Sequence, residues 1–339
     1  MGDYLKAFEK HSEYETYSSG DMLKPNVSYC EDNNEVHYNP LTWADTYLTF
    51  VAKGSGTFTF SPQNSNTISY SKNNGDWTVG NSIGVNSGDK VLWKGIMTPN
   101  SNGIGKFSST AKFDVQGNVM SLLYGDNFKG QVNLSGKNNA FYQLFFQNSK
   151  VVSAENLSLP ATTLASGCYG DMFASCTALK TTPVLPATTL DGYCYSEMFL
   201  GCTSLTTAPE LPATTLANYC YDYMFASCTA LTAAPELPAT TLASNCYEYM
   251  FRDCTSLTTA PVLPATTLAY GCYFYMFADC TKLNYIKAMF TTTPSDDFTN
   301  KWVVGVSSNG TFVKNSAAGW NVTGVNGVPS GWTVETASA

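Results

Sequence analysis

Ten cysteines stand in two regular columns, and this residue type can form disulfides, bind zinc or act as a nucleophile. Both columns repeat every 26 residues. The columns are Cys168, Cys194, Cys220, Cys246 and Cys272, and Cys176, Cys202, Cys228, Cys254 and Cys280. Within one copy the two cysteines are eight residues apart. On a helix that spacing separates their Cα atoms by roughly 12 Å, beyond the ~7 Å limit for a disulfide. The spacing is not C-x-x-C and no histidine lies nearby, which disfavours zinc. We therefore expect ten reduced cysteines in the structural core, and no metal or cofactor.

One catalytic motif is present, because Gly80-Asn81-Ser82-Ile83-Gly84 matches the G-x-S-x-G nucleophile elbow of serine hydrolases. That elbow needs a strand before it, a helix after it, and an acid and a histidine downstream. Here both histidines, His11 and His37, precede Ser82, and the surrounding sequence is rich in turns. A polar hairpin loop explains the motif better, so no catalytic residue is expected.

Acidic residues offer two further candidate sites. Glu31-Asp32 with Glu35, and Asp296-Asp297, carry oxygen ligands that suit calcium, but neither group has the spacing of an EF-hand loop. Solvated turns are the simpler interpretation. Glycoside hydrolysis needs two carboxyl groups that face each other across the substrate, and no such pair is evident in the sequence.

Variation between the copies gives the best indication of binding. The core columns scarcely change, whereas two neighbouring columns do. These variable columns are Gly170, Ser196, Asp222, Glu248 and Phe274, and Asp171, Glu197, Tyr223, Tyr249 and Tyr275. Stacked copies would set the members of each column side by side. Exposed aromatic side chains suit contact with a sugar or a protein. The candidate ligand-binding residues are therefore Tyr223, Tyr249, Tyr275, Asp222, Glu248 and Phe274. Tyr221, Tyr247 and Tyr273 either extend this strip or serve as packing.

The repeat that positions these residues begins with Leu-Pro-Ala-Thr-Thr-Leu and continues as Cys-Tyr-x-x-Met-Phe-x-x-Cys-Thr-x-Leu. A fixed period in this range is typical of a solenoid in which each copy forms one coil. In the second copy, Leu190, Cys194, Met198, Phe199 and Cys202 recur every three to four residues, which predicts a short helix. Residues 206–210 then predict a short extended segment. One coil buries too few side chains to offset the entropy of ordering 26 residues, so the coils must stack.

The motif Phe-x-x-Cys-x-x-Leu, followed by Leu-Pro and Thr-Leu, resembles the BspA-like (Treponema pallidum type) leucine-rich repeats of bacterial surface proteins. The resemblance covers about residues 141–290 and departs from the usual BspA-like unit by about three residues around Cys-Tyr-x-x. It implies an α/β leucine-rich-repeat solenoid and a non-enzymatic adhesin. The flanking regions look like companions of such repeats in gut Bacteroidetes proteins. Lys24–Cys30 and Glu35–Pro40 also look like the openings of structural proteins from phages of these bacteria.

These observations predict a multidomain chain. Residues 1–45 would form an N-terminal docking segment, with a strand pair around a polar turn at 31–34. Alternating apolar residues separated by turns predict a β-sandwich-like module over residues 46–135. The leucine-rich-repeat solenoid would cover residues 136–290, with five full copies and one degenerate copy. A β-rich C-terminal cap would cover residues 291–339.

Composition limits the classes of partner that this protein is expected to bind. The chain has 339 residues with 26 acidic and 18 basic side chains and a net charge of −8, so nucleic acid is an unlikely partner. No apolar run is long enough to span a membrane, and the start lacks the apolar region of a secretory signal.

We expect a recognition or adhesion protein on a virion or bacterial surface that binds a protein or glycan on a cell. Residues 1–45 would contact other chains of the assembly, and oligomerisation stays open. Alternatives are a purely structural virion component and, more weakly, a glycan-processing enzyme.

Overall fold

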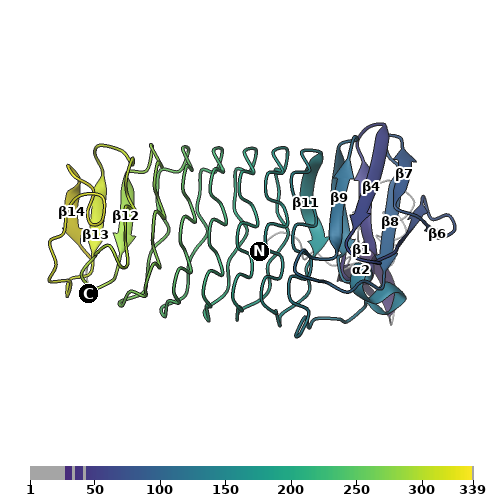
Figure 1. Cartoon of the computed structure of the whole chain (residues 1–339), viewed down its shortest axis with the longest axis horizontal. Helices are drawn as coiled ribbons and strands as arrows, with labels where there is room; N and C mark the ends of the chain where they lie inside the picture. The colour runs from purple at the N-terminus through teal and green to yellow at the C-terminus, as the bar shows by residue number, and fades with distance from the viewer. Residues whose placement is uncertain (1–26, 33–34, 41–42, 338–339) are drawn as a thin grey trace.

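The computed structural model describes residues 27–32, 35–40 and 43–337. These residues form an elongated molecule, with a two-sheet module at one end and a stack of coils that runs to the C-terminal end (Figure 1). Most of the predicted docking segment, residues 1–45, lies outside the described residues. Within it, β1 (Val27–Asp32) pairs antiparallel with β2 (Glu35–Pro40), as the polar turn between them predicts.

The N-terminal module consists of two sheets packed face to face. The larger sheet has the order β11-β10-β3-β8-β5-β6. Its strands are β3 (Leu48–Ala52), β5 (Ile68–Lys72), β6 (Thr78–Val79), β8 (Lys90–Gly95), β10 (Phe113–Asn118) and β11 (Val151–Ser158). The smaller sheet has the order β7-β4-β9, with β4 (Gly56–Pro62), β7 (Ser82–Val85) and β9 (Gly105–Ser109). Buried aromatic rings join the two sheets: the centroid of Phe50 lies 5.4 Å from that of Phe58 and 4.7 Å from that of Phe107.

Helix is scarce in the described residues. Over residues 27–32, 35–40 and 43–337 there is one α-helix of four residues, α2 (Ser121–Tyr124), and there are two 3₁₀ turns, η1 (Trp43–Asp45) and η2 (Gly125–Asn127). The prediction of an α/β leucine-rich-repeat solenoid is therefore wrong. The copies do stack as coils, but the segment expected to be a helix in each copy is a series of tight turns.

The turn segment, which we call the turn wall, covers residues 191–202 of the second copy and its equivalents. Hydrogen bonds there alternate between two patterns. The N–H of Met198 donates to the carbonyl of Tyr195 within the same coil, at 3.2 Å. The next N–H, that of Phe199, donates to the carbonyl of Met224 in the following coil, at 3.0 Å. Every second amide thus ties one coil to its neighbour, a pattern that an α-helix cannot provide because its amides bond within the helix.

The period of burial explains why the sequence resembles a helix. Along the turn wall two buried residues alternate with two partly exposed ones: Cys194 and Tyr195 are buried, Ser196 and Glu197 are partly exposed, and Met198 and Phe199 are buried again. This gives a period of four, whereas a helix has a period of 3.6. Over a segment of about a dozen residues the two periods place nearly the same side chains inside.

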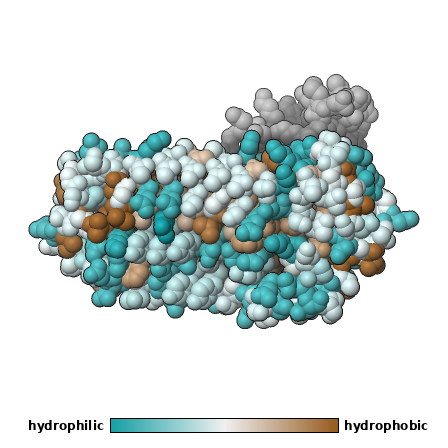
Figure 2. Space-filling view, turned by 45° about the horizontal axis from the view of Figure 1, so that its top comes forward, coloured by the Kyte–Doolittle hydropathy of each residue, from teal (hydrophilic) through white to brown (hydrophobic). Residues whose placement is uncertain are grey.

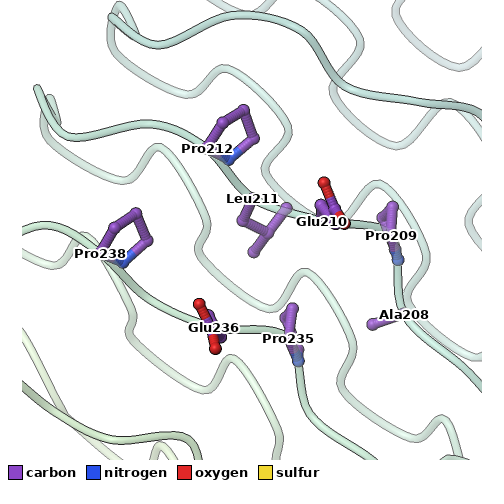
Figure 3. Close-up of a pocket in the computed structure, with 8 residues that line it drawn as sticks. All are labelled: Ala208, Pro209, Glu210, Leu211, Pro212, Pro235, Glu236 and Pro238. Atoms are coloured by element: carbon purple, nitrogen blue, oxygen red, sulfur yellow. The ribbon is translucent and has the colours of Figure 1, made fainter. Parts of the chain in front are cut away.

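The other side of each coil, residues 206–216 and equivalents, is extended, and we call it the extended wall. Parallel bridges such as that between Thr207 and Ala233 join its coils. Between Pro209–Pro212 and Pro235–Pro238 no hydrogen bond is present, because proline has no N–H to donate. A shallow groove of about 590 Å³ separates the two coils there, with Glu210 and Glu236 side by side at its edge (Figure 3).

The coil stack is bonded to the module at one end and continues into the C-terminal region at the other. Strand β11, the first strand of the stack, pairs in parallel with β10 of the module. At the other end β12 (Tyr285–Ala288), β13 (Thr311–Lys314) and β14 (Thr333–Thr336) form a parallel three-stranded sheet. The ring of Trp302 stacks on that of Tyr273, with their centroids 6.1 Å apart. Residues 291–337 therefore extend the stack with two further, irregular coils.

Candidate functional site

Each coil contributes two invariant aromatic residues to columns inside the stack. Tyr169, Tyr195, Tyr221, Tyr247 and Tyr273 form one column, and Phe173, Phe199, Phe225, Phe251 and Phe277 form the other. Neighbouring rings within each column are nearly parallel, with centroids 5.7–6.1 Å apart. All ten side chains are buried. Tyr221, Tyr247 and Tyr273 therefore pack the core and do not belong to a binding strip.

Tyr223, Tyr249 and Tyr275 form a second, partly exposed column on the turn wall, which we call the tyrosine ladder. The ring centroids of Tyr223 and Tyr249 are 4.2 Å apart, and those of Tyr249 and Tyr275 are 4.7 Å apart. Because the rings stack along the axis of the molecule, neighbours cover most of their faces. The ladder therefore presents ring edges and hydroxyl groups to a partner, with the rotamers fixed in advance.

The backbone at the tyrosine ladder is left-handed, as it is at the buried Tyr169 and Tyr195 of the core column, where φ is 62° and 63°. Tyr223, Tyr249 and Tyr275 have φ values of 52°, 53° and 51°, in the left-handed region that glycine adopts most easily. Glycine occupies other left-handed positions of the turn wall, at Gly201 and Gly271. The ladder column contains no glycine in any of its five copies. The left-handed conformation therefore belongs to the turn wall as a whole, and the ladder differs from the core column in its partial exposure and in its variation between copies.

Four carboxyl groups lie beside the tyrosine ladder in successive coils: Asp171, Glu197, Asp222 and Glu248, which we call the carboxylate row. Burial raises the pKa of Asp171, and Asp171 hydrogen-bonds the Tyr142 side chain. Burial, together with the nearby charge of Asp171, raises the pKa of Glu197. The Glu197 carboxyl, when protonated, donates a hydrogen bond to Asp171. Burial thus disfavours the ionised form of every carboxyl group in the row.

Asp222 has the least favourable environment for a charged carboxyl group in the carboxylate row. Its Oδ1 atom is buried and has no hydrogen-bond partner. Burial, and then the charges of Glu248 and Glu197, raise its pKa to about 8. Glu248 is better accommodated, since its Oε2 accepts a hydrogen bond from the Nδ2 of Asn245. Asp222 and Glu248 both lie next to the tyrosine ladder, as their column predicts.

Aromatic side chains also flank the carboxylate row on its other side. The rings of Tyr193 and Tyr219 stack with centroids 4.9 Å apart, and Tyr193 is exposed. Phe274, a predicted site residue, makes an edge contact with the exposed Tyr270, at 5.6 Å. Tyr193, Tyr219 and Tyr270 were not among the residues predicted from the sequence. Their columns vary between copies as the ladder column does, and that variation was the signal that would have found them.

A pocket of about 500 Å³ opens at the end of the tyrosine ladder. Its lining residues come from three coils: Glu197, Leu200, Tyr223, Ala226, Ser227, Arg252 and Asp253. The guanidinium of Arg252 lies over the ring of Tyr249, 5.6 Å from its centroid. The Arg252 Nε lies 3.4 Å from the Asp253 Oδ2. The pocket thus combines an aromatic ring, a hydroxyl, carboxyl groups and a guanidinium.

The other candidates from the sequence form no site. All ten cysteines of the two columns are buried free thiols. The thiols of Cys202, Cys228 and Cys254 each donate to a phenylalanine carbonyl of the preceding coil, at 3.1–3.2 Å. Burial raises the pKa of Cys228 to about 12. Ser82 lies at the start of β7, where its hydroxyl pairs with that of Thr59 at 3.2 Å, and not on a strand-to-helix turn. Among the residues that the structure describes, no group of His, Cys, Asp and Glu is arranged to hold a metal ion.

The surface around the coils is mixed in character. Figure 2 shows one face, on which hydrophilic and intermediate residues predominate and apolar residues gather only in small patches. Within the described part of the chain, no helix is long and apolar enough to span a membrane. Comparison with family models, with curated proteins and with solved structures gave no match to this chain.

Proposed function

We propose that this chain is a non-enzymatic recognition protein that binds a glycan or protein on a cell surface through the turn wall of its coils. The observation that carries the proposal is the tyrosine ladder, three stacked and partly exposed tyrosines held in left-handed backbone conformations. Tyrosine is effective in binding surfaces because it offers a large, rigid contact area together with a hydroxyl group. Stacking within the ladder removes most of the rotamer entropy that binding would otherwise cost.

We place this protein on a virion or bacterial surface. The supporting argument is the resemblance of the repeat to the BspA-like repeats of bacterial surface proteins, together with the scarcity of charge and abundance of Tyr, Thr and Asn. A rigid stack that repeats one surface element in successive coils suits such display, since several weak contacts then act together.

The test is binding of the fluorescently labelled full chain to intact cells and to a glycan array. We expect Tyr249→Ala and Tyr275→Ala each to weaken binding at least tenfold while the far-UV spectrum and melting temperature stay near those of the parent. Val184→Ala provides the control, since Val184 is 72 % exposed on the extended wall. Unchanged binding in both tyrosine variants would exclude the ladder as the contact surface and would favour a purely structural role.

A further inference from the structure

Arg252 is the only arginine in the chain. The equivalent positions in the other full copies are Ala174, Leu200, Ala226 and Ala278. Packing therefore requires only a small or apolar residue at this position. An arginine that departs from its own column, at the pocket beside the tyrosine ladder, points to a role in binding.

The contacts of Arg252 hold its side chain while leaving most of its donors free. The ring of Tyr249 supports the guanidinium through a cation–π contact, and Asp253 engages only the Nε edge. The two terminal nitrogens have no hydrogen-bond partner within the part of the chain that the structure describes. The side chain is 42 % exposed, so this edge of the guanidinium is open to the pocket.

A planar guanidinium with two free nitrogens matches a carboxylate, phosphate or sulfate group by a bidentate hydrogen bond. The surroundings discriminate among these anions. Asp253 and Glu197 line the same pocket, and Asp171 lies behind Glu197. The carboxylate of Asp253, next to the guanidinium, would repel a doubly charged phosphate more strongly than a singly charged carboxylate, while burial disfavours the charged form of Glu197.

The remaining pocket residues suit the body of a sugar. Tyr223 stands at the end of the tyrosine ladder that is nearer the pocket. Among the described aromatic residues only Tyr249 stacks on its ring. Tyr223 lines the pocket, where an apolar face of a pyranose can pack against its ring. The Ser227 hydroxyl and the carboxyl groups of Glu197 and Asp253 can hydrogen-bond sugar hydroxyls.

We propose that this pocket binds a carboxylate-bearing sugar, with Arg252 pairing with the carboxylate and Tyr223 packing against the ring. The inference rests on the proposed recognition function and narrows its ligand to an acidic glycan. It concerns the pocket at one end of the tyrosine ladder, so other parts of the ladder contact neighbouring sugar units or the carrier.

The experiment measures binding of three probes to the full chain by isothermal titration calorimetry and saturation-transfer NMR. The probes are sialyllactose, a galacturonic acid trimer and neutral lactose. We expect at least one acidic sugar to bind at least tenfold more tightly than lactose. Arg252→Ala should reduce the affinity for that sugar to the level of lactose, and Arg252→Lys should recover only part of it. Because alanine occupies this position in three of the other four full copies, Arg252→Ala is expected to fold normally, and Lys180→Gln is the control for a general loss of positive charge.

Equal affinity for acidic and neutral sugars, or unchanged affinity in Arg252→Ala, would overturn the acidic-sugar inference. An acidic peptide and inorganic phosphate are titrated alongside the three sugars, and tighter binding of either one than of both acidic sugars would also overturn the inference. In each of these cases the proposed recognition function survives as long as Tyr249→Ala and Tyr275→Ala weaken binding to cells. If neither tyrosine variant weakens binding to cells, the proposed recognition function is itself refuted.

Discussion

Residues of the turn wall fall into two groups, those that pack inside the stack and those that are partly exposed. Buried residues such as Phe199 and Cys202 recur in every full copy, since each must fit the same space between the same neighbours. Partly exposed residues such as Glu197 and Tyr223 differ from coil to coil although their backbone conformation is the same. Variation at a fixed conformation therefore separates the partly exposed positions, which the proposed recognition function would use, from the positions that packing determines.

Asp222 makes stability depend on pH. Its folded-state pKa, raised to about 8, lies above the usual unfolded value of ~3.9. Its contribution to stability is therefore fully present below pH ~4 and is lost as the pH rises through about 8. Asp222→Asn cannot ionise, and we expect it to be more stable than the parent at pH 8 by roughly 1–3 kcal/mol, with a much smaller difference at pH 4.

The check is chemical denaturation of both proteins from pH 4 to pH 9. Asp279→Asn is the matched control, because Asp279 is exposed on the turn wall of another coil. A stability difference for Asp222→Asn that stays constant over this pH range would show that Asp222 is not a raised-pKa acid in the folded chain.

At the scale of the element, the unit of this fold is one coil of 26 residues. Neighbouring coils are joined by the same amide-to-carbonyl bonds, such as those from Phe199 to Met224 and from Phe225 to Met250, at 3.0 and 2.9 Å. Repeats of this kind contribute to stability approximately one neighbour interface at a time. Removing one whole unit should therefore leave two compatible surfaces that stack again.

Deletion of residues 204–229 tests this expectation, since Thr203 then joins Ala230 and the repeat continues in phase. We expect a folded chain with a lower unfolding free energy than the parent. Deletion of 13 residues, 204–216, is the matched control and should give an unfolded or aggregated protein because it puts a turn wall where the extended wall belongs. Circular dichroism and thermal melts distinguish the two, and similar behaviour of both deletions would contradict a coil-by-coil fold.

The sequence predicted much of this element but not its backbone. The period of 26 residues gave the coil length, the stacking, and the buried cysteine, methionine and phenylalanine columns. It did not separate a four-residue turn repeat from a helix, because both place Cys194, Met198 and Cys202 inside. The pocket was also missed, although Arg252 stands out from its column in the sequence alone. Its neighbours Glu197 and Tyr223 come from other coils, and only the stacking brings them together.

At the scale of the whole molecule, the module closes one end of the coil stack. The parallel pairing of β10 with β11 makes one continuous sheet from the module into the first coil. The ring of Phe107 stacks on that of Phe145, with centroids 5.8 Å apart. Such pairing between distant segments leaves no local signal in the sequence, so module and repeat looked like separate domains.

A chain that begins at residue 119 tests the role of the module. This truncation leaves β11 with an unpaired edge and removes the ring of Phe107 from Phe145. Exposed edges of this kind promote association. We expect this truncated chain to form oligomers or aggregates under conditions in which the full chain has a defined size. Size-exclusion chromatography with light scattering provides the measurement. A soluble, monomeric truncated chain would show that the coils need no cap at this end.

The coil-to-coil hydrogen bonds described above also set how the molecule responds to a pulling force. A chain held at one end and bound to a cell at the other is under tension whenever the liquid around it flows. Each coil is bonded only to its two neighbours, so under tension the stack is expected to unwind one coil at a time from its loaded end. Every coil releases about 90 Å of extended chain, at roughly 3.4 Å per residue. The protein would then lengthen in steps under a sudden increase in force. The coils that remain stacked would keep their contacts with the proposed ligand.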